Sequence, residues 1–110
     1  VIQAVLTLQT AAAAEQLLTT QADQWTRCAG TRITVNYPQP PTPLRWTFGE
    51  VAKTVIVVSI PYVMESGAGM SCQRAMSARN NVVVDVLVCR PDVGNQGVDV
   101  AEAIRAKIPG

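Results

Sequence analysis

The stretch from Cys72 to Cys89, CQRAMSARNNVVVDVLVC, narrows most sharply what this chain can fold into. Its centre, Asn80-Asn81, is a candidate two-residue turn, because asparagine tolerates the positive φ that type I′ hairpin turns require. A hairpin with this turn places Cys72 opposite Cys89 on a non-hydrogen-bonded rung, where Cα atoms approach to roughly 4.5 Å. A disulfide needs about 4.4–6.8 Å. The stretch therefore predicts a β-hairpin closed at its open end by a Cys72–Cys89 disulfide.

The same register divides the side chains of the hairpin between two faces. We expect helices to cover the face with the alternating valines, packing on it through Leu18, Trp25 or Ile104. On the other face Arg74 and Asp85 lie diagonally, close enough to pair. They form either an ion pair contributing at most about 1 kcal/mol or the polar anchor of a ligand site. The valines are Val82, Val84, Val86 and Val88, and the other face carries Cys72, Arg74, Met76, Val83, Asp85, Leu87 and Cys89.

Composition excludes several classes of function. At 110 residues the chain is one small domain, and 48% hydrophobic with 15% charged residues is typical of a globular protein. A net charge of +1 without a basic cluster argues against a nucleic-acid partner. The sequence has no histidine, the commonest general base and metal ligand, and its three cysteines lack zinc-site spacing. We therefore expect no metal, no cofactor and no catalytic residues.

The rest of the sequence predicts an α+β domain, an antiparallel β-sheet flanked by helices. Thr10 is a plausible N-cap for a first helix that ends at Ala29-Gly30, and a second helix is predicted over 96–107. Strands are predicted over 1–8, 31–37, 44–49 and 53–64, the first of them buried. The chain starts at Val1 without an initiator methionine, so we expect a fragment or processed product. Expressed alone, it is expected to dimerise or aggregate through a free sheet edge, or to need an upstream segment supplied in trans.

Cys28 is left over once Cys72 and Cys89 are paired. It lies on the apolar stripe of the first helix beside Trp25, where it could be an inert buried thiol. A catalytic nucleophile is disfavoured because no histidine is present to activate it. The interpretation we favour is a disulfide to a segment upstream of Val1, since an odd cysteine in an extracellular protein suggests a partner elsewhere.

Three segments carry a resemblance to a known family: QWTRCAG at 24–30, RWTFGEV at 45–51 and, above all, the Cys72–Cys89 stretch. They resemble the PknH-like extracellular domain, the sensor domain of mycobacterial receptor Ser/Thr kinases, which also occurs in secreted mycobacterial lipoproteins. The resemblance implies a longer domain, of which residues 1–110 form the C-terminal portion, with two disulfides and a cleft for an unidentified ligand. It also implies that Cys28 pairs with a cysteine in the N-terminal portion, which this chain lacks.

The leading hypothesis is a non-enzymatic sensor domain on the extracellular side of the plasma membrane, binding a small molecule or cell-wall component for a transmembrane kinase. The alternative is an envelope lipoprotein domain of the same fold with a carrier or interaction role. An envelope hydrolase is disfavoured, because no two acidic residues form a recognisable catalytic motif. The candidate ligand is anionic or hydroxylated, although Asp85 would neutralise Arg74. The candidate binding residues are Arg74, Asp85, Met76 and Leu87, extended by Trp46 and Tyr62.

Overall fold

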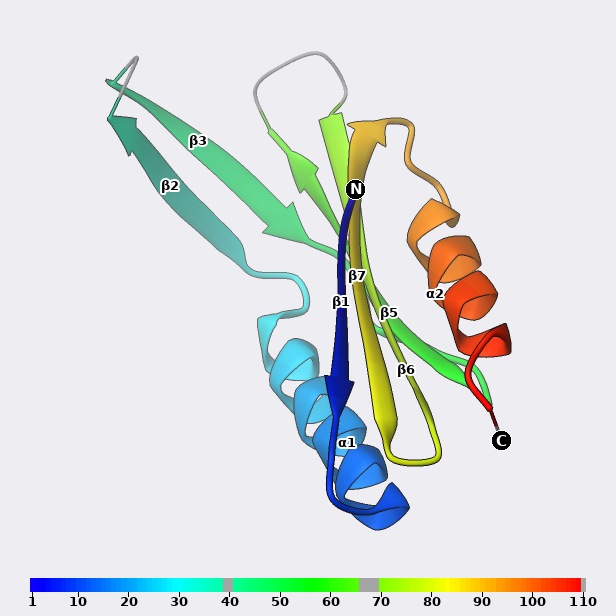
Figure 1. Cartoon of the computed structure of the whole chain (residues 1–110). Coiled ribbons are helices and arrows are strands. Elements are labelled where there is room, and N and C mark those ends of the chain that lie inside the picture. Colours follow the sequence, from blue (N-terminus) through cyan, green and yellow to red (C-terminus); the bar gives the residue numbers. More distant parts are fainter. Residues whose placement is uncertain (39–40, 66–69, 110) are drawn as a thin grey trace.

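A computed structural model describes residues 1–38, 41–65 and 70–109, and shows one antiparallel sheet with a helix on each face (Figure 1). The seven strands are ordered β1-β7-β6-β5-β3-β2, with β4 pairing on β5. This confirms the predicted α+β class. The elements are β1 (Ile2–Thr7), α1 (Ala11–Cys28), β2 (Arg32–Pro38), β3 (Pro41–Phe48), β4 (Ala52–Lys53), β5 (Val57–Met64), β6 (Met70–Arg79), β7 (Val82–Pro91) and α2 (Gln96–Ala106).

Strands β6 and β7 form the predicted hairpin in the predicted register. Cys72 lies opposite Cys89, and the two residues form a disulfide with their Cα atoms 4.1 Å apart. Only the first turn residue, Asn80, has a positive φ, of 54°. This differs from the predicted type I′ turn, in which both central residues have a positive φ. The side chain of Asn81 donates a hydrogen bond to the Leu8 carbonyl at 2.8 Å, and this bond holds the segment that follows β1 against the turn.

The valine face of the hairpin is covered by α2, as predicted. Val84 and Val86 are fully buried and belong to one apolar cluster with Ala101, against which Ile104 packs. The expected contacts of this face with Leu18 and Trp25 are wrong, because both lie on α1 and pack on the opposite face. The alternation of residues separates the two faces of a strand but carries no information about which helix covers which face.

Helix α1 packs on the other face, toward the end of the sheet that carries the β6–β7 turn (Figure 1). It begins as predicted, with the Thr10 hydroxyl accepting from the Ala13 backbone N–H at 3.0 Å. Beneath it lies Met76, which is 2% exposed and packs in one cluster with Val83 and Trp25. The helix therefore covers Met76, and the role of this residue in ligand binding stays a prediction. The sequence places Met76 on the same face as Arg74, but it does not show how much of that face α1 covers.

Strand β1 is an edge strand, but the prediction that it is buried is wrong. All of its residues are exposed, including Ile2 at 67% and Val5 at 58%. It pairs with β7, and α1 and α2 belong to core clusters that contain no β1 residue. An apolar pattern does not distinguish a covered strand from an uncovered one. Self-association through this uncharged edge stays a prediction.

The predicted strand over 53–64 is two strands. β4 ends at Lys53, and a turn at Thr54 leads into β5. The Thr54 hydroxyl accepts from the Val57 backbone N–H at 3.0 Å, which closes the turn. β5 then pairs with β6 on one side, and with β4 and β3 in succession on the other. Pro61, which has no N–H to donate, lies between the segments that pair with β4 and with β3.

Helix α2 approaches β6 closely at Gly97. The buried side chain of Gln73 accepts from the Val98 backbone N–H at 3.0 Å and donates to Asn95 Oδ1 at 2.9 Å. The Asn95 side chain makes no capping hydrogen bond of its own. A side chain from the sheet therefore satisfies one of the free donors at the start of the helix.

We expect Gly97→Ala to destabilise the domain by about 0.5–2 kcal/mol in total, because overpacking usually costs about 1–3 kcal/mol. A Cβ at Gly97 would lie 2.8 Å from the Gln73 backbone oxygen, so α2 would have to move away from the sheet. This cost opposes the roughly 1 kcal/mol gain in helix propensity. Urea denaturation measures the difference, with Glu102→Ala on the exposed side of α2 as the control. A Gly97→Ala protein as stable as the parent would show that the close approach is not required.

Candidate ligand-binding site

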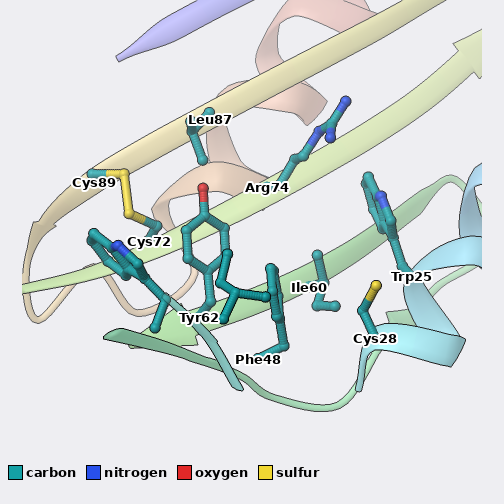
Figure 2. Close-up of a pocket in the computed structure, with 11 residues that line it drawn as sticks. Trp25, Cys28, Phe48, Ile60, Tyr62, Cys72, Arg74, Leu87 and Cys89 are labelled. Atoms are coloured by element: carbon teal, nitrogen blue, oxygen red, sulfur yellow. A yellow bond between two sulfur atoms is a disulfide. The ribbon is translucent and has the colours of Figure 1, made fainter. Parts of the chain in front are cut away.

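A cavity of about 500 Å³ opens on the α1 face of the sheet, beside the C-terminal end of that helix (Figure 2). Its walls are mostly apolar, and four of its lining residues are aromatic. Among the lining residues that the structure describes, only Arg74 is charged. The lining residues are Trp25, Cys28, Ile33, Trp46, Phe48, Ile60, Tyr62, Cys72, Arg74, Leu87 and Cys89.

The wall formed by α1 depends on where this helix ends. Gly30, with φ of 75°, reverses the chain after the last turn, a conformation that glycine adopts without steric cost. The Gly30 backbone N–H then donates to the Phe48 carbonyl at 2.9 Å, and the Phe48 N–H donates to Thr31 at 2.9 Å. These bonds fix the last helical turn, with Trp25, beside strand β3.

The aromatic wall comes from β3 and β5. Trp46 and Phe48 alternate along β3, so both point to the same face of the sheet. The Trp46 and Tyr62 ring centroids lie 5.5 Å apart, edge to face, and those of Phe48 and Tyr62 lie 5.1 Å apart. Such pairs are typically stabilising by about 0.5–1.5 kcal/mol beyond burial. The wall is therefore held in place before any ligand binds.

Arg74 and Asp85 form a bidentate ion pair, as the diagonal register predicts. Arg74 Nε lies 3.1 Å from Asp85 Oδ1, and Nη2 lies 2.7 Å from Oδ2. The hydrogen bond to Asp85 raises the pKa of Arg74, while burial opposes the rise. The guanidinium also lies over the Trp25 ring, 5.2 Å from its centroid. The ion pair thus links the sheet to α1 at the edge of the cavity.

A second, smaller cavity of about 240 Å³ adjoins the first. It shares Tyr62, Arg74 and Leu87 with the larger cavity, and Asp85 lines it together with Ile2 and Ala4 of β1. Arg74 of the ion pair therefore lines both cavities.

Most of the residues predicted from the sequence gather around these cavities. Arg74, Leu87, Trp46 and Tyr62 line the larger one and Asp85 the smaller, whereas Met76 lines neither. That these residues bind a ligand stays a prediction.

Sequence reasoning missed two aromatic residues of the site. Phe48 follows from the same alternation that places Trp46. Trp25, which the helical stripe predicts as a core residue, is 7% exposed, but it also lines the cavity. No pattern in the sequence gives both of its roles.

The structure corrects the expected environment of Cys28. The residue is exposed rather than buried, because it occupies the last turn of α1, at the far side of the cavity from the Cys72–Cys89 disulfide (Figure 2). It forms no disulfide within the described part of the chain. Pairing with a cysteine outside this chain stays a prediction.

The described residues contain no group of three or more His, Cys, Asp or Glu side chains that could hold a metal ion. Asp85, the acidic residue at the cavities, is engaged with Arg74 through both of its oxygens. No helix in the described ranges has the length and apolar character needed to cross a lipid bilayer. The two cavities thus combine mostly apolar walls with one ion pair.

Comparison with known proteins finds close relatives. The family model described as the PknH-like extracellular domain matches residues 1–107. Serine/threonine-protein kinases PknH from Mycobacterium bovis and Mycobacterium tuberculosis are each 39% identical over 106 residues, which cover 96% of this chain and 17% of each kinase. The crystal structure of the extracellular domain of PknH from M. tuberculosis matches with a TM-score of 0.87 and 39% identity. That match covers 96% of this chain and 53% of the crystallised chain.

Proposed function

Because this chain belongs to the PknH-like extracellular domain family, we propose that it is a non-enzymatic, ligand-binding sensor domain of a transmembrane Ser/Thr protein kinase. The family is described as an extracellular domain, and this chain matches only 17% of the length of the kinase PknH. The kinase reaction would therefore be carried out by another part of such a protein. The contribution of this domain would be to recognise a ligand outside the cell.

The cavity on the α1 face carries this proposal. Its volume of about 500 Å³ lies within the range of roughly 300–1,000 Å³ that is typical of small-molecule sites. Apolar and aromatic walls with few polar groups are also typical of such sites. The Trp46–Tyr62 and Phe48–Tyr62 contacts hold these walls in place, which lowers the ordering cost of binding.

The same cavity argues against catalysis. The chain has no histidine, and the ion pair of Arg74 and Asp85 engages both oxygens of the carboxylate. Histidine is the most frequent general base, and the carboxylate at these cavities is already held by Arg74. Among the described residues that line the two cavities, Asp85 is the only acidic side chain.

Helix α1 is the element best placed to report binding. Trp25 lines the cavity and is also part of the core cluster that joins α1 to β5, β6 and β7. A ligand that contacts the Trp25 ring would therefore favour one position of α1 on the sheet over others. A ligand shifts such an equilibrium only by its difference in affinity for the two positions.

We expect a ligand from a screen of cell-wall precursors and metabolites to stabilise the domain through this cavity. At a ligand concentration one hundred times Kd, binding adds about 2.7 kcal/mol of stability. For about 100 residues this raises Tm by roughly 10 °C. The stabilisation should be lost in Trp46→Ala, which opens the aromatic wall.

The matched control is Val55→Ala, at a fully exposed position outside both cavities. This variant should keep the full shift in Tm. A ligand that stabilises the parent and Trp46→Ala equally would place binding elsewhere. Measurable turnover of the ligand would overturn the assignment as a non-enzyme.

A further inference from the structure

We propose that the ligand is an uncharged amphiphile whose hydroxylated head group binds the Arg74–Asp85 pair in the smaller cavity, while its hydrocarbon part occupies the larger cavity. This inference rests on the proposed ligand-binding function and specifies its chemistry. It begins from the shared lining of the two cavities. Because Arg74 and Tyr62 line both, a molecule that fills the larger cavity contacts the guanidinium of the ion pair, which also lines the smaller one.

The two cavities differ in polarity. In the larger cavity the aromatic rings of Trp25, Trp46 and Phe48 form the walls, and Arg74 at its edge is the charged group among the described lining residues. In the smaller cavity both members of the ion pair line the wall, beside the apolar side chains of β1. Of the two cavities, only the smaller is lined by both charges of the ion pair, so a polar head group is best accommodated there and a hydrocarbon part in the larger one.

The ion pair retains hydrogen-bonding capacity on both of its members. The bridge uses Nε and one N–H of Nη2, and one lone pair on each oxygen of Asp85. The bridge does not use the Nη1 group of Arg74 or the remaining lone pairs of the carboxylate. The two side chains are partly accessible, with exposed fractions of 39% for Arg74 and 21% for Asp85. The pair thus offers donors and acceptors side by side.

Charge selects a neutral head group over an ionic one. An anion that approaches Arg74 also approaches the carboxylate of Asp85, which repels it. A cation that approaches Asp85 is likewise repelled by the guanidinium of Arg74. The bridge is fixed from both ends, by its two hydrogen bonds and by the Trp25 ring beneath the guanidinium. Hydroxyl groups donate to a carboxylate and accept from a guanidinium, so adjacent hydroxyls on one head group match this pair without a net charge.

The test compares three probes that share an octyl chain and differ in head group: n-octyl β-D-glucoside, octyl sulfate and octyltrimethylammonium. Each is titrated below the concentration at which it forms micelles. Binding is followed by tryptophan fluorescence, because both tryptophans line the larger cavity. We expect the glucoside to bind at least ten-fold more tightly than either ionic probe.

Two variants should change this ranking in opposite directions. Asp85→Asn leaves the charge of Arg74 unpaired, and the preference should shift at least ten-fold toward octyl sulfate. Arg74→Gln leaves the carboxylate unpaired, and the preference should shift toward octyltrimethylammonium. The control Asp99→Asn removes an exposed charge on α2, on the other side of the sheet, and should leave the ranking unchanged.

The outcomes separate this inference from the proposed function. If octyl sulfate or octyltrimethylammonium binds the parent as tightly as the glucoside, the neutral head group is wrong, while the apolar cavity remains a ligand site. If none of the octyl probes changes the fluorescence, both proposals are overturned. If a variant fails to give a cooperative melting transition, the ranking of probes on the parent protein decides alone.

Discussion

Val86→Asp is expected to abolish cooperative folding of this domain. Val86 is fully buried in the cluster that α2 forms with the sheet. Its burial contributes about 1.5–3 kcal/mol, which the substitution removes. A carboxylate without a partner in this position adds a penalty of several kcal/mol. The sum is comparable with the whole stability of a small domain, about 5–15 kcal/mol. Thermal and urea denaturation followed by circular dichroism would show no sigmoidal transition.

The matched control for this prediction is Val55→Asp. Val55 is fully exposed, at 102% of its reference area, in the turn between β4 and β5. The same change of side chain there should alter the free energy of unfolding by less than about 0.5 kcal/mol. If Val86→Asp melted within a degree or two of the parent, the valine face would not be the core face of the hairpin.

The sequence predicts most reliably the features that are set by neighbouring residues. The β6–β7 register follows from a two-residue turn and two cysteines at equal distances from it. The start of α1 follows from the Thr10 cap, and its end follows from Gly30, because the capping group and the backbone conformation are properties of a few residues. The hairpin register, itself a local property, also places Arg74 diagonally opposite Asp85.

The features that the sequence does not predict depend on which element covers which surface. Met76 and Leu87 share a face of the hairpin, yet α1 buries Met76 and leaves Leu87 beside both cavities. Ile2 has the composition of a core residue and is exposed on the edge strand. Both outcomes are set by the position of α1 over the sheet, which results from packing between segments distant in the sequence.

The cavity itself illustrates the same limit. Its residues come from α1 and from β2, β3, β5, β6 and β7. The strands bring them together because β5 pairs with both β3 and β6. Trp46 and Tyr62 are predictable candidates because they lie on neighbouring predicted strands. Trp25 is not, because its place on the apolar stripe of a helix predicts a core residue and says nothing of the space beyond it.

Removing the disulfide is the second change expected to have a large effect. The double variant Cys72→Ala/Cys89→Ala should lose about 3 kcal/mol of stability, since the disulfide spans 17 residues of sequence and restricts the unfolded chain. The pairing of β6 with β7 extends along both strands from Arg79–Val82 to Met70–Pro91, well beyond the one pair that the disulfide joins. The fold should therefore survive with a lower midpoint of urea denaturation and with far-ultraviolet circular dichroism like that of the parent.

The control is Cys28→Ala, which removes an exposed cysteine that forms no disulfide in the described part of the chain. This variant should change the free energy of unfolding by less than about 0.5 kcal/mol. Peptide mapping without reduction provides an independent check, because the parent should yield a Cys72–Cys89 peptide. A main species that links Cys28 to Cys72 or Cys89 would contradict the register, since it would separate the one pair of cysteines that the hairpin holds face to face. An equal loss of stability in Cys28→Ala and in the double variant would show that the loss does not come from opening the hairpin disulfide.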